Sequence, residues 1–382
     1  MEEWKLTKIG SLCKKVCSGG TPKSTVEEYY GGGIPWLNTK EVNFNRIYST
    51  ESTISEAGLN NSSAKWIDKH SVIVAMYGAT AAKCAIGMIP MTTNQACCNL
   101  MIDEGLADYR FVYYALTNAY STLASLANGG AQQNLNAQLI KDFEIPLPDL
   151  QTQHRIADIL STIDDKIENN IRINHNLLDI AQSLFNEHIA KNSAGLENGA
   201  LTDIATYLNG IAMQKYPVKD IEAGLHVLKI KELGQGFCDE NSDKCTSAIP
   251  EQYIIKDGDI IFSWSGTLLV DYWCGGICGL NQHLFKVSSN CFPSWFIYFW
   301  TNHHLDRFKR IAQDKAVTMG HIRKTDLEQA KVFIPQEGDL RELDHLIGPL
   351  MKEFVQRRLE NRRIEIVRDK LLSFLLSERL AI

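Results

Sequence analysis

The stretch PDLQTQHRIADILSTIDDKIENNIRINHNLLDIAQSLF, residues 148–185, sets the architecture of the chain. From Ile156 onward, apolar residues and two asparagines recur at alternating intervals of four and three residues. They are Ile156, Leu160, Ile163, Ile167, Asn170, Asn174, Leu177, Ala181 and Leu184. This spacing is the seam of a coiled coil, and Pro148 stops a helix from extending further back. The pattern therefore predicts a long helix over 150–190 that pairs with a second helix.

A matching stretch lies near the carboxyl end, where the same kind of seam predicts a helix over 337–382. Its seam positions include Leu343, Ile347, Leu350, Phe354, Asn361, Ile364, Leu371 and Leu375. Pro349 falls inside this stretch, so the helix is expected either to start late or to kink. The alternative to pairing is that each long helix packs only on its own domain.

Charge and seam composition favour the pairing. The helix at 150–190 carries more acidic than basic side chains, whereas 352–379 carries eight Lys or Arg against five Asp or Glu. Asparagine in a seam fixes register at some cost in stability. We expect antiparallel pairing through Ile156, Leu160, Ile163, Ile167, Asn174, Leu177, Phe354, Asn361, Ile364 and Leu371.

The sequence also contains an internal repeat. Segments of the first half match segments of the second half in the same order, at an offset that drifts from 195 to 187 residues. The matches are 6–9 with 201–204, 36–42 with 227–233, Gly78 with Gly266, Asn94-Gln95 with Asn281-Gln282, Pro148 with Pro335, and Asn174 with Asn361. Ordered matches with small drifts indicate an internal duplication with insertions in loops.

Each half has the same plan. Short strand-like runs broken by Gly and Pro come first, then helical stretches at 109–127 and 294–312, then a long helix. The small and polar segment 191–200 reads as a linker. We predict an α+β fold: two similar mixed α/β heads at 1–149 and 201–336, joined by the helices 150–190 and 337–382. The helices form an antiparallel coiled-coil spacer with approximate two-fold symmetry.

Bulk composition narrows the setting. No apolar run reaches the roughly 18 residues that span a membrane, and the start MEEWKLTKIG lacks an apolar signal core. The ten cysteines form no disulfide framework, so we expect a cytoplasmic protein with reduced thiols and no membrane partner. The formal charge of −6 counts mildly against nucleic-acid binding, although local distribution matters more than the total.

Motifs of catalysis and cofactor binding are missing. The sequence has no Gly-Lys dipeptide for a phosphate loop, no H-E-x-x-H and no C-x-x-C. Cys13/Cys17 and Cys274/Cys278 have C-x3-C spacing without a second half, and we interpret them as small buried hydrophobes. We expect binding rather than turnover, with no catalytic residue, metal or cofactor in this chain.

The heads share polar loop side chains of the kinds that read base edges and hold phosphates. Ordinary solvation is the alternative for each of them, and Asn94 and Asn281 also fit a structural role in bonding local backbone. The candidates in the first head are Thr21, Lys23, Ser24, Asn38, Lys40, Tyr77, Thr80, Lys83, Asn94, Gln95, Gln132, Gln133 and Asn134. Those in the second are Gln214, Lys215, Lys229, Lys231, Trp264, Ser265, Thr267, Asn281, Gln282, His321, Arg323 and Lys324.

The loop CSGGTPKS at 17–24 suggests a phosphate cradle. The second head has LNGIAMQK at the matching place, 208–215, and a common cofactor would need the same loop in both heads. We therefore interpret 17–24 as a turn that presents Thr21, Lys23 and Ser24 towards a DNA backbone.

The arrangement resembles the specificity subunit of type I restriction-modification systems. The resemblance is carried by SGGTPKS and YYGGGIPWLNTKEV within 18–42 and by GGAQQNLNAQLIKDFEIPLPDLQTQHRIADILSTIDDKI at 129–167, and the duplicated plan covers nearly the whole chain. The second copy departs from the pattern, with IPQEGDLRELDHLI at 334–347. The resemblance implies such a difference between the heads, because each head would read a different half-site.

The resemblance implies a non-catalytic subunit whose heads are target-recognition domains, each reading one half of a bipartite double-stranded DNA site. It implies that the helices set the spacer and dock two modification subunits, which bind S-adenosylmethionine and methylate adenine. Restriction subunits that use ATP and Mg would join them. A coiled-coil scaffold that does not bind DNA is the alternative, and an enzyme with its own methyltransferase or nuclease site is disfavoured by the missing motifs.

Overall fold

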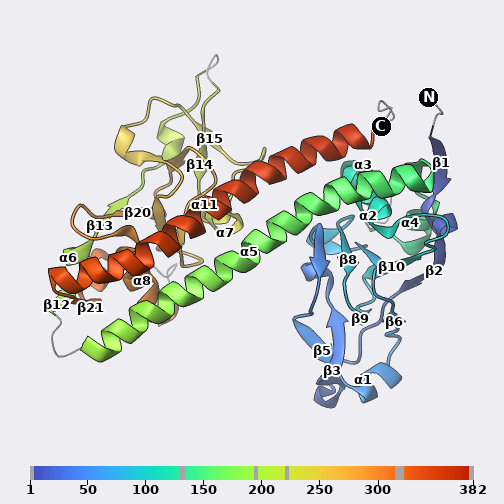
Figure 1. Cartoon of the computed structure of the whole chain (residues 1–382), viewed down its shortest axis with the longest axis horizontal. Coiled ribbons are helices and arrows are strands. Elements are labelled where there is room, and N and C mark those ends of the chain that lie inside the picture. The colour runs from blue at the N-terminus through green and yellow to red at the C-terminus, as the bar shows by residue number, and fades with distance from the viewer. Residues whose placement is uncertain (1–3, 129–133, 193–196, 220–222, 315–321, 378–382) are drawn as a thin grey trace. The chain divides into compact units, whose positions relative to one another are not determined.

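The computed structural model of the chain describes residues 4–128, 134–192, 197–219, 223–314 and 322–377 (Figure 1). The chain divides into two compact units. The first unit combines Met1–Asp165 with Ile366–Ile382, and the second unit is Lys166–Glu365. Each unit contains one head and a segment of each of two long helices, α5 (Leu150–Asn192) and α11 (Glu337–Leu375).

The first head is built from three sheets and four short helices. A five-stranded sheet has the order β2-β10-β7-β8-β4, a four-stranded sheet has the order β5-β3-β9-β6, and β1 pairs with β11. The strands are β1 (Lys5–Lys8), β2 (Cys13–Ser18), β3 (Tyr30–Leu37), β4 (Asn45–Ile47), β5 (Ser52–Ile54), β6 (Trp66–Ile67), β7 (Val72–Ala75), β8 (Cys84–Gly87), β9 (Met91–Thr93), β10 (Cys97–Ile102) and β11 (Glu144–Leu147). The helices are α1 (Glu56–Asn60), α2 (Tyr109–Asn118), α3 (Tyr120–Asn128) and α4 (Ala137–Asp142).

The second head repeats these sheets in the same strand order, except that, over the described residues, its large sheet has four strands and lacks a counterpart of β4. Its sheets are β13-β20-β17-β18, β15-β14-β19-β16 and β12-β21, and the one parallel pair of the second sheet, β14 with β19, matches β3 with β9. The strands are β12 (Glu197–Ala200), β13 (Thr206–Asn209), β14 (Leu225–Leu228), β15 (Lys244–Cys245), β16 (Ile254–Ile255), β17 (Ile260–Ser263), β18 (Leu269–Tyr272), β19 (Cys278–Leu280), β20 (Leu284–Ser288) and β21 (Lys331–Ile334). The helices are α6 (Leu201–Ile204), α7 (Ile230–Gln235), α8 (Ser294–His303), α9 (Leu305–Asp314) and α10 (Lys324–Glu328).

The central strands form because their side chains are apolar on both faces. All four residues of β7 and of β17 are buried, as are all six of β10. Such continuous apolar runs are typical of strands that are covered on both sides. In the first head α2 covers one side of the large sheet and lies between it and α5 (Figure 1).

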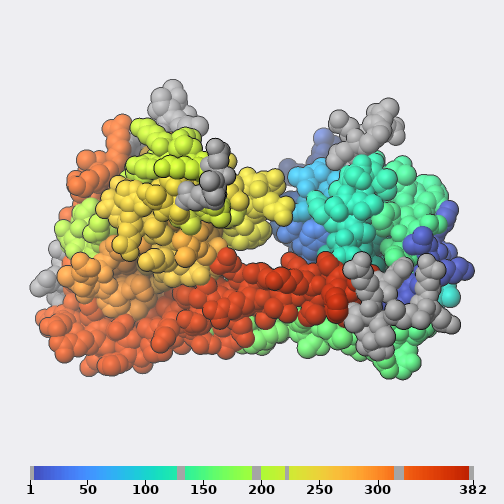
Figure 2. All heavy atoms as spheres, turned by 90° about the horizontal axis from the view of Figure 1, so that it is seen from above, coloured from blue at the N-terminus to red at the C-terminus, as the bar shows by residue number. Residues whose placement is uncertain are grey.

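Each long helix buries apolar side chains in the core of a head. Ile156 and Leu160 of α5 join the first core, together with Leu372 and Leu375 of α11. In the second unit, the core takes side chains from both helices: Ala181, Phe185, Leu343, Ile347, Met351 and Phe354. Figure 2 shows this packing for the second unit, where residues 201–336 (lime to orange) lie on α11 (red). The remaining expected seam residues differ in burial: Ile167, Asn174 and Asn361 are buried, while Ile163, Leu177, Ile364 and Leu371 are half-buried.

Polar side chains join α5 to α11 within the second unit. The Nδ2 atom of Asn170, a fully buried residue, donates to Oδ1 of Asn361 at 2.7 Å and to a carboxylate oxygen of Glu360 at 2.7 Å. Arg357 donates to Oδ1 of Asn170 at 2.9 Å, and Asn361 donates to the backbone oxygen of Ile167 at 3.2 Å. Both polar atoms of the buried Asn170 amide thus have partners on α11.

The first unit has its own link between the two helices. Arg368 of α11 forms an ion pair with Asp164 of α5 at 3.1 Å, and the hydroxyl of Tyr114 donates to the same carboxylate at 2.6 Å. Burial opposes the charge of Arg368, but the carboxylates of Asp164 and Asp369 raise its pKa overall.

Three expectations meet a different structure. The late start of the second long helix is wrong: α11 begins at Glu337 and contains Pro349. Ile347 and Met351 on either side of the proline are buried in the second core, and this packing offsets the missing backbone hydrogen bond. Residues 197–200, which the sequence assigns to a linker, form β12. The stretches 109–127 and 294–312 are each two helices, with breaks after Asn118 and His303.

The alignment of 6–9 with 201–204 is also wrong. Residues 6–8 lie in strand β1, whereas Leu201–Ile204 is helix α6. The backbone N–H of Ile9 donates to Phe143, and that of Leu201 donates to Ala330, so Ile9 is the counterpart of Leu201. The offset there is 201 − 9 = 192 residues, and the similar letters LTKI and LTDI occupy different elements.

We predict that Asn361→Ala destabilises the second unit. The substitution leaves one N–H of the buried Asn170 amide without its acceptor, and an unsatisfied buried polar group costs about 1–3 kcal/mol. Urea unfolding of the full chain should show the loss. Asn176→Ala is the matched control, because Asn176 is exposed on α5 and should change stability by less than about 0.5 kcal/mol. Equal losses in both variants would contradict the role of the Asn170–Asn361 contact.

Candidate nucleic-acid interface

The candidate loops of the first head meet at one edge, where β2, β3 and β7 end and β10 begins. Backbone hydrogen bonds hold them together. The N–H of Gly19 donates to Cys97 at 3.3 Å, that of Asn94 to Leu37 at 2.9 Å, and that of Leu135 to Met76 at 3.2 Å. Loops from five parts of the sequence are therefore brought to one place on the head.

The second head holds its loops with equivalent bonds. The N–H of Gly210 donates to Leu284 at 2.9 Å, that of Asn281 to Leu228 at 3.2 Å, and that of Ile322 to Trp264 at 3.2 Å. Each donor and acceptor occupies the position that matches its counterpart in the first head. We call the two sets of loops the first and second loop edges.

Two glycines make the close approach of these loops possible. A Cβ atom on Gly19 would lie 2.2 Å from the backbone oxygens of Thr93 and Asn94. On Gly210 it would lie 2.1 Å from the backbone oxygen of Asn281. Both distances are far below van der Waals contact, so the two positions accept no side chain.

The rest of the loop 17–24 is anchored from below and presents three side chains. Pro22 is buried, and its backbone oxygen accepts a hydrogen bond from the Tyr30 hydroxyl at 2.7 Å. Thr21, Lys23 and Ser24 are exposed, as the sequence predicts for a presented turn. The counterpart loop in the second head exposes Gln214 and Lys215.

Several of the predicted lysines are already neutralised within their head. Lys40 forms an ion pair with Glu51 at 2.6 Å, Lys231 with Asp239 at 3.0 Å, and Lys229 with Asp243. The hydrogen-bonded carboxylate raises the pKa of Lys40 and of Lys231. Lys83 donates to the side chain of Asn43 at 2.6 Å. Within the described ranges, the candidate lysines with neither an ion-pair nor a side-chain hydrogen-bond partner are Lys23, Lys215 and Lys324, and all three are exposed.

Other candidates have structural partners. The Asn38 side chain accepts from the N–H of Lys40 at 3.2 Å, and the Thr80 hydroxyl donates to the backbone oxygen of Thr39 at 3.0 Å. Ser265 is buried, with its hydroxyl 3.1 Å from Nδ1 of His283. The indole N–H of Trp264 donates to Asn209 at 3.0 Å. As DNA contacts these residues stay predictions.

Some predicted residues are exposed at the loop edges, and others fall outside the described ranges. Tyr77, Asn134, Thr267 and Arg323 are exposed. Gln132, Gln133 and His321 lie outside the described residues.

The cysteine thiols of the first head lie in its cores, where burial raises the pKa of Cys84, Cys97 and Cys98 to about 12. In the part of the chain that the structure describes, no group of three or more His, Cys, Asp or Glu is placed to hold a metal ion.

The structural role that the sequence allows for Asn94 and Asn281 is confirmed. Oδ1 of Asn94 accepts from the N–H of Ala96 at 3.1 Å, and Oδ1 of Asn281 accepts from the N–H of His283 at 3.2 Å. Both residues are buried. Each asparagine closes a tight turn, and the glutamine that follows it, Gln95 or Gln282, sits at the tip of that turn.

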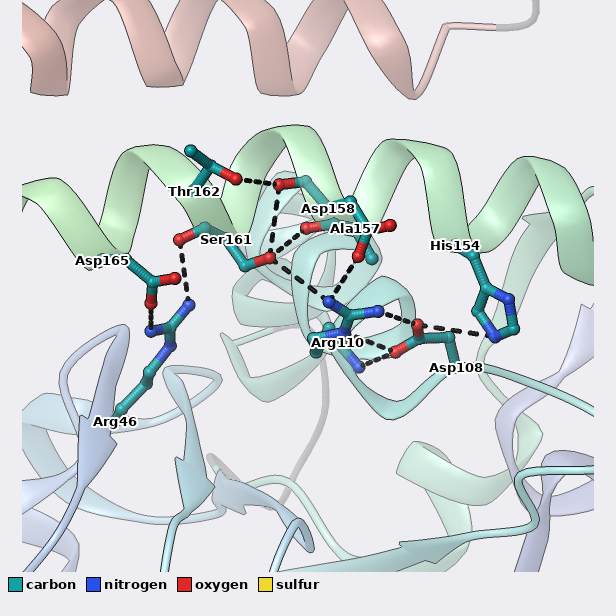
Figure 3. Close-up of polar contacts among 9 residues, drawn as sticks. All are labelled: Arg46, Asp108, Arg110, His154, Ala157, Asp158, Ser161, Thr162 and Asp165. Carbon is teal, nitrogen blue, oxygen red and sulfur yellow. Dashed lines mark hydrogen bonds and ion pairs between the residues drawn. The ribbon is translucent and has the colours of Figure 1, made fainter.

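Sequence reasoning missed the arginines that fix the first head to α5. Arg110 forms ion pairs with Asp108 and Asp158, each at 2.7 Å, and Arg46 pairs with Asp165 (Figure 3). The hydrogen bond to Asp108 is the main cause that raises the pKa of Arg110. The excess of acidic residues in the 150–190 helix could have indicated these ion pairs. Asp158 and Asp165 of that helix contact the first head, not the other long helix.

The second head is fixed to α11 by a corresponding use of charge. The guanidinium of Arg358 donates two hydrogen bonds to the carboxylate of Asp271, at 2.6 and 2.8 Å. Trp295 donates its indole N–H to Asp344 of α11 at 2.7 Å. Two parallel bonds restrict orientation as well as distance, so Arg358 fixes the orientation of the second head on α11.

We predict that Gly19→Ala disrupts the first loop edge. The new methyl group would collide with backbone that cannot move without breaking the Asn94 turn, and overpacking of this kind costs about 1–3 kcal/mol or more. Thermal unfolding should show the loss. The control is Gly33→Ala in β3, where an added Cβ meets no atom within 4 Å. A Gly19→Ala chain as stable as Gly33→Ala would show that the close approach is not required.

Comparison with known proteins agrees with this architecture. Residues 1–177 match the family model described as the type I restriction modification DNA specificity domain. The chain is 27% identical over 402 aligned residues to the type I restriction enzyme MjaIX specificity subunit of Methanocaldococcus jannaschii, covering 97% of this chain and 92% of that protein. It is 29% identical over 169 residues to the EcoR124I/EcoR124II specificity subunit of Escherichia coli, covering 42% of this chain and 41% of that protein.

A solved structure supports the fold. The crystal structure of the type I restriction-modification system S subunit from M. genitalium matches 99% of this chain and 97% of its own, with a TM-score of 0.60 and 18% sequence identity. Within the described residues, no helix has the length and apolar character needed to cross a bilayer.

Proposed function

The chain belongs to the specificity subunits of type I restriction-modification systems, and from that premise we propose that its two loop edges read the two halves of one bipartite DNA site. Membership of this family favours the DNA-reading function over a scaffold that does not bind DNA. The subunit is a recognition component rather than an enzyme. The first head, 1–149, and the second head, 201–336, are then its two target-recognition domains.

One observation carries this proposal: the two heads hold equivalent loops by equivalent backbone bonds and fill them with different side chains. Gly19 and Gly210 are common to both, but GTPKS at 20–24 stands where the second head has IAMQK at 211–215. Two domains with the same loop backbone and different polar side chains are suited to recognising two different DNA sequences. Reading sequence needs side chains at base edges, while phosphate contacts only position the protein.

The two long helices would act as the spacer between half-sites. We propose that 150–190 and 337–382 pair as an antiparallel coiled coil with approximate two-fold symmetry. The Asn170–Asn361 and Asp164–Arg368 contacts support the pairing. At about 1.5 Å per residue, the 43 residues of α5 rise about 65 Å, long enough to span several base pairs between the bases that are read.

Catalysis would belong to partner subunits. We propose that the duplicated plan docks two modification subunits, which supply S-adenosylmethionine chemistry, and that restriction subunits with ATP and Mg join them in the cytoplasm. The charge of this chain supports a complex in which the partner subunits make many of the contacts to DNA phosphates. With a formal charge of −6 and several loop lysines neutralised within the heads, the chain offers few free cations of its own for phosphates.

Methylome sequencing tests the function directly. Expression of this chain with its modification subunit should add a methyl-adenine motif made of two specific half-sites separated by unread bases. Cells with the modification subunit alone should lack that motif. A methylome that is identical with and without this chain would contradict the proposal.

We predict that Lys23→Ala weakens DNA binding and lowers its dependence on salt. Lys23 is exposed and has no ion-pair partner among the described residues, and removal of one phosphate contact reduces the slope of log K against log salt by about one. Binding of the assembled complex to duplex DNA should be measured at several salt concentrations. Lys5→Ala is the control, because Lys5 is exposed on β1 and does not belong to the first loop edge. An unchanged slope for Lys23→Ala would give loop 17–24 a structural role only.

A further inference from the structure

Gln95 and Gln282 occupy the same place on the two loop edges. Each follows the buried asparagine of a tight turn, Asn94 or Asn281, whose backbone N–H is bonded to the end of the neighbouring parallel strand, β3 or β14. Gly19 and Gly210 pack directly against these turns. The two glutamines are therefore held on rigid supports beside the loops that face the proposed DNA, although each has a different neighbour.

In the first head the carbonyl of Gln95 is engaged. The hydroxyl of Thr21 donates to Oε1 of Gln95. The side chain of Gln95 is exposed, and its NH₂ group has no hydrogen-bond partner among the residues that the structure describes. The amide thus presents its two N–H donors outward.

In the second head the amide nitrogen is engaged instead. Nε2 of Gln282 lies 3.3 Å from Nε2 of His283. An amide nitrogen can only donate, so the ring nitrogen accepts, and the ring proton is on Nδ1, which donates to the Ser265 hydroxyl at 3.1 Å. The carbonyl oxygen of Gln282 has no partner within the described ranges, so this amide presents an acceptor.

These arrangements suit different base edges in the major groove. Two amide donors match the adjacent O6 and N7 acceptors of guanine, whereas a carbonyl acceptor matches the amino group of adenine or cytosine. An amide oxygen accepts two hydrogen bonds and an amide NH₂ donates two. Thr21 uses one site on the Gln95 carbonyl and His283 one site on the Gln282 nitrogen, so the group with both sites free is the NH₂ of Gln95 and the carbonyl of Gln282. The neighbours Thr21 and His283 therefore decide what each amide can read.

We infer that Gln95 and Gln282 are specificity-determining residues of opposite polarity. Gln95 reads an acceptor edge, with guanine as the best match, in one half-site. Gln282 reads an amino group in the other. This inference rests on the proposed function and assigns, within it, one base-reading contact to each head.

Replacement of each glutamine by glutamate separates the two polarities. Gln95→Glu keeps the shape and the acceptor for Thr21 but removes both donors. Gln282→Glu keeps an acceptor for the base, and His283 can move its proton to Nε2 and donate to the new carboxylate while Ser265 donates to Nδ1. Both variants add the same negative charge beside the DNA, so each controls the other for phosphate repulsion.

The experiment is methylome sequencing of host genomic DNA with each variant expressed beside the modification subunit. Methylation of the wild-type motif should fall about tenfold or more for Gln95→Glu, because this side chain can no longer donate to the base. The loss for Gln282→Glu should be at least about threefold smaller than the loss for Gln95→Glu, because the new side chain still offers the base an acceptor. Equal losses in the two variants, or an unchanged motif with Gln95→Glu, would overturn the assignment.

Thr21→Val provides a second test that changes no charge. Removing the hydroxyl frees the carbonyl of Gln95, so one position of the first half-site should accept adenine as well as guanine while the second half-site stays the same. An unaltered first half-site would contradict the role of Thr21. Failure of the proposed function is distinguishable, because the wild-type chain would then add no bipartite motif at all.

Discussion

The structure of both heads depends on a place where two backbones touch with no room for a side chain. Gly19 lies against the carbonyl groups of Thr93 and Asn94, and Gly210 lies against that of Asn281. This approach sets the loop that can meet phosphates beside the turn that carries a glutamine. The frame is made from backbone and from buried asparagine, so the exposed side chains can differ between the heads without altering it.

Charge in this chain is used mainly for internal alignment. Arg46 and Arg110 fix the first head to α5, and Arg358 fixes the second to α11. Such pairs are partly or largely shielded from water, so the geometry of the contact matters more than the number of charges. An acidic net charge is therefore compatible with DNA recognition, since the charges that face outward at the loop edges are a small subset of the total.

Features set by local sequence could be predicted, and features set by distant partners could not. The two long helices follow from the periodicity of their apolar positions, and the buried strands β7 and β17 follow from matching short apolar runs that lead to Gly78 and Gly266. The pairing of Arg46 with Asp165 joins residues 119 apart, and no pattern in either segment announces it. For the same reason the lysines at 40, 229 and 231 read as free cations until the fold brings carboxylates to them. The match of 6–9 with 201–204 is wrong because four similar residues can occur in different elements. The backbone hydrogen bonds of Ile9 and Leu201 identify the equivalent positions.

The first unit is built from both ends of the sequence, and this determines when it can finish folding. Its core includes Leu372 and Leu375, and its ion pair between Asp164 and Arg368 joins residues 204 apart. A ribosome must therefore synthesise the chain past Leu375 before the first head acquires its last apolar cover. Contacts of such long sequence separation close late, because the entropy of the intervening loop must be overcome first. The head that is synthesised first thus finishes folding only after the head that is synthesised second has left the ribosome.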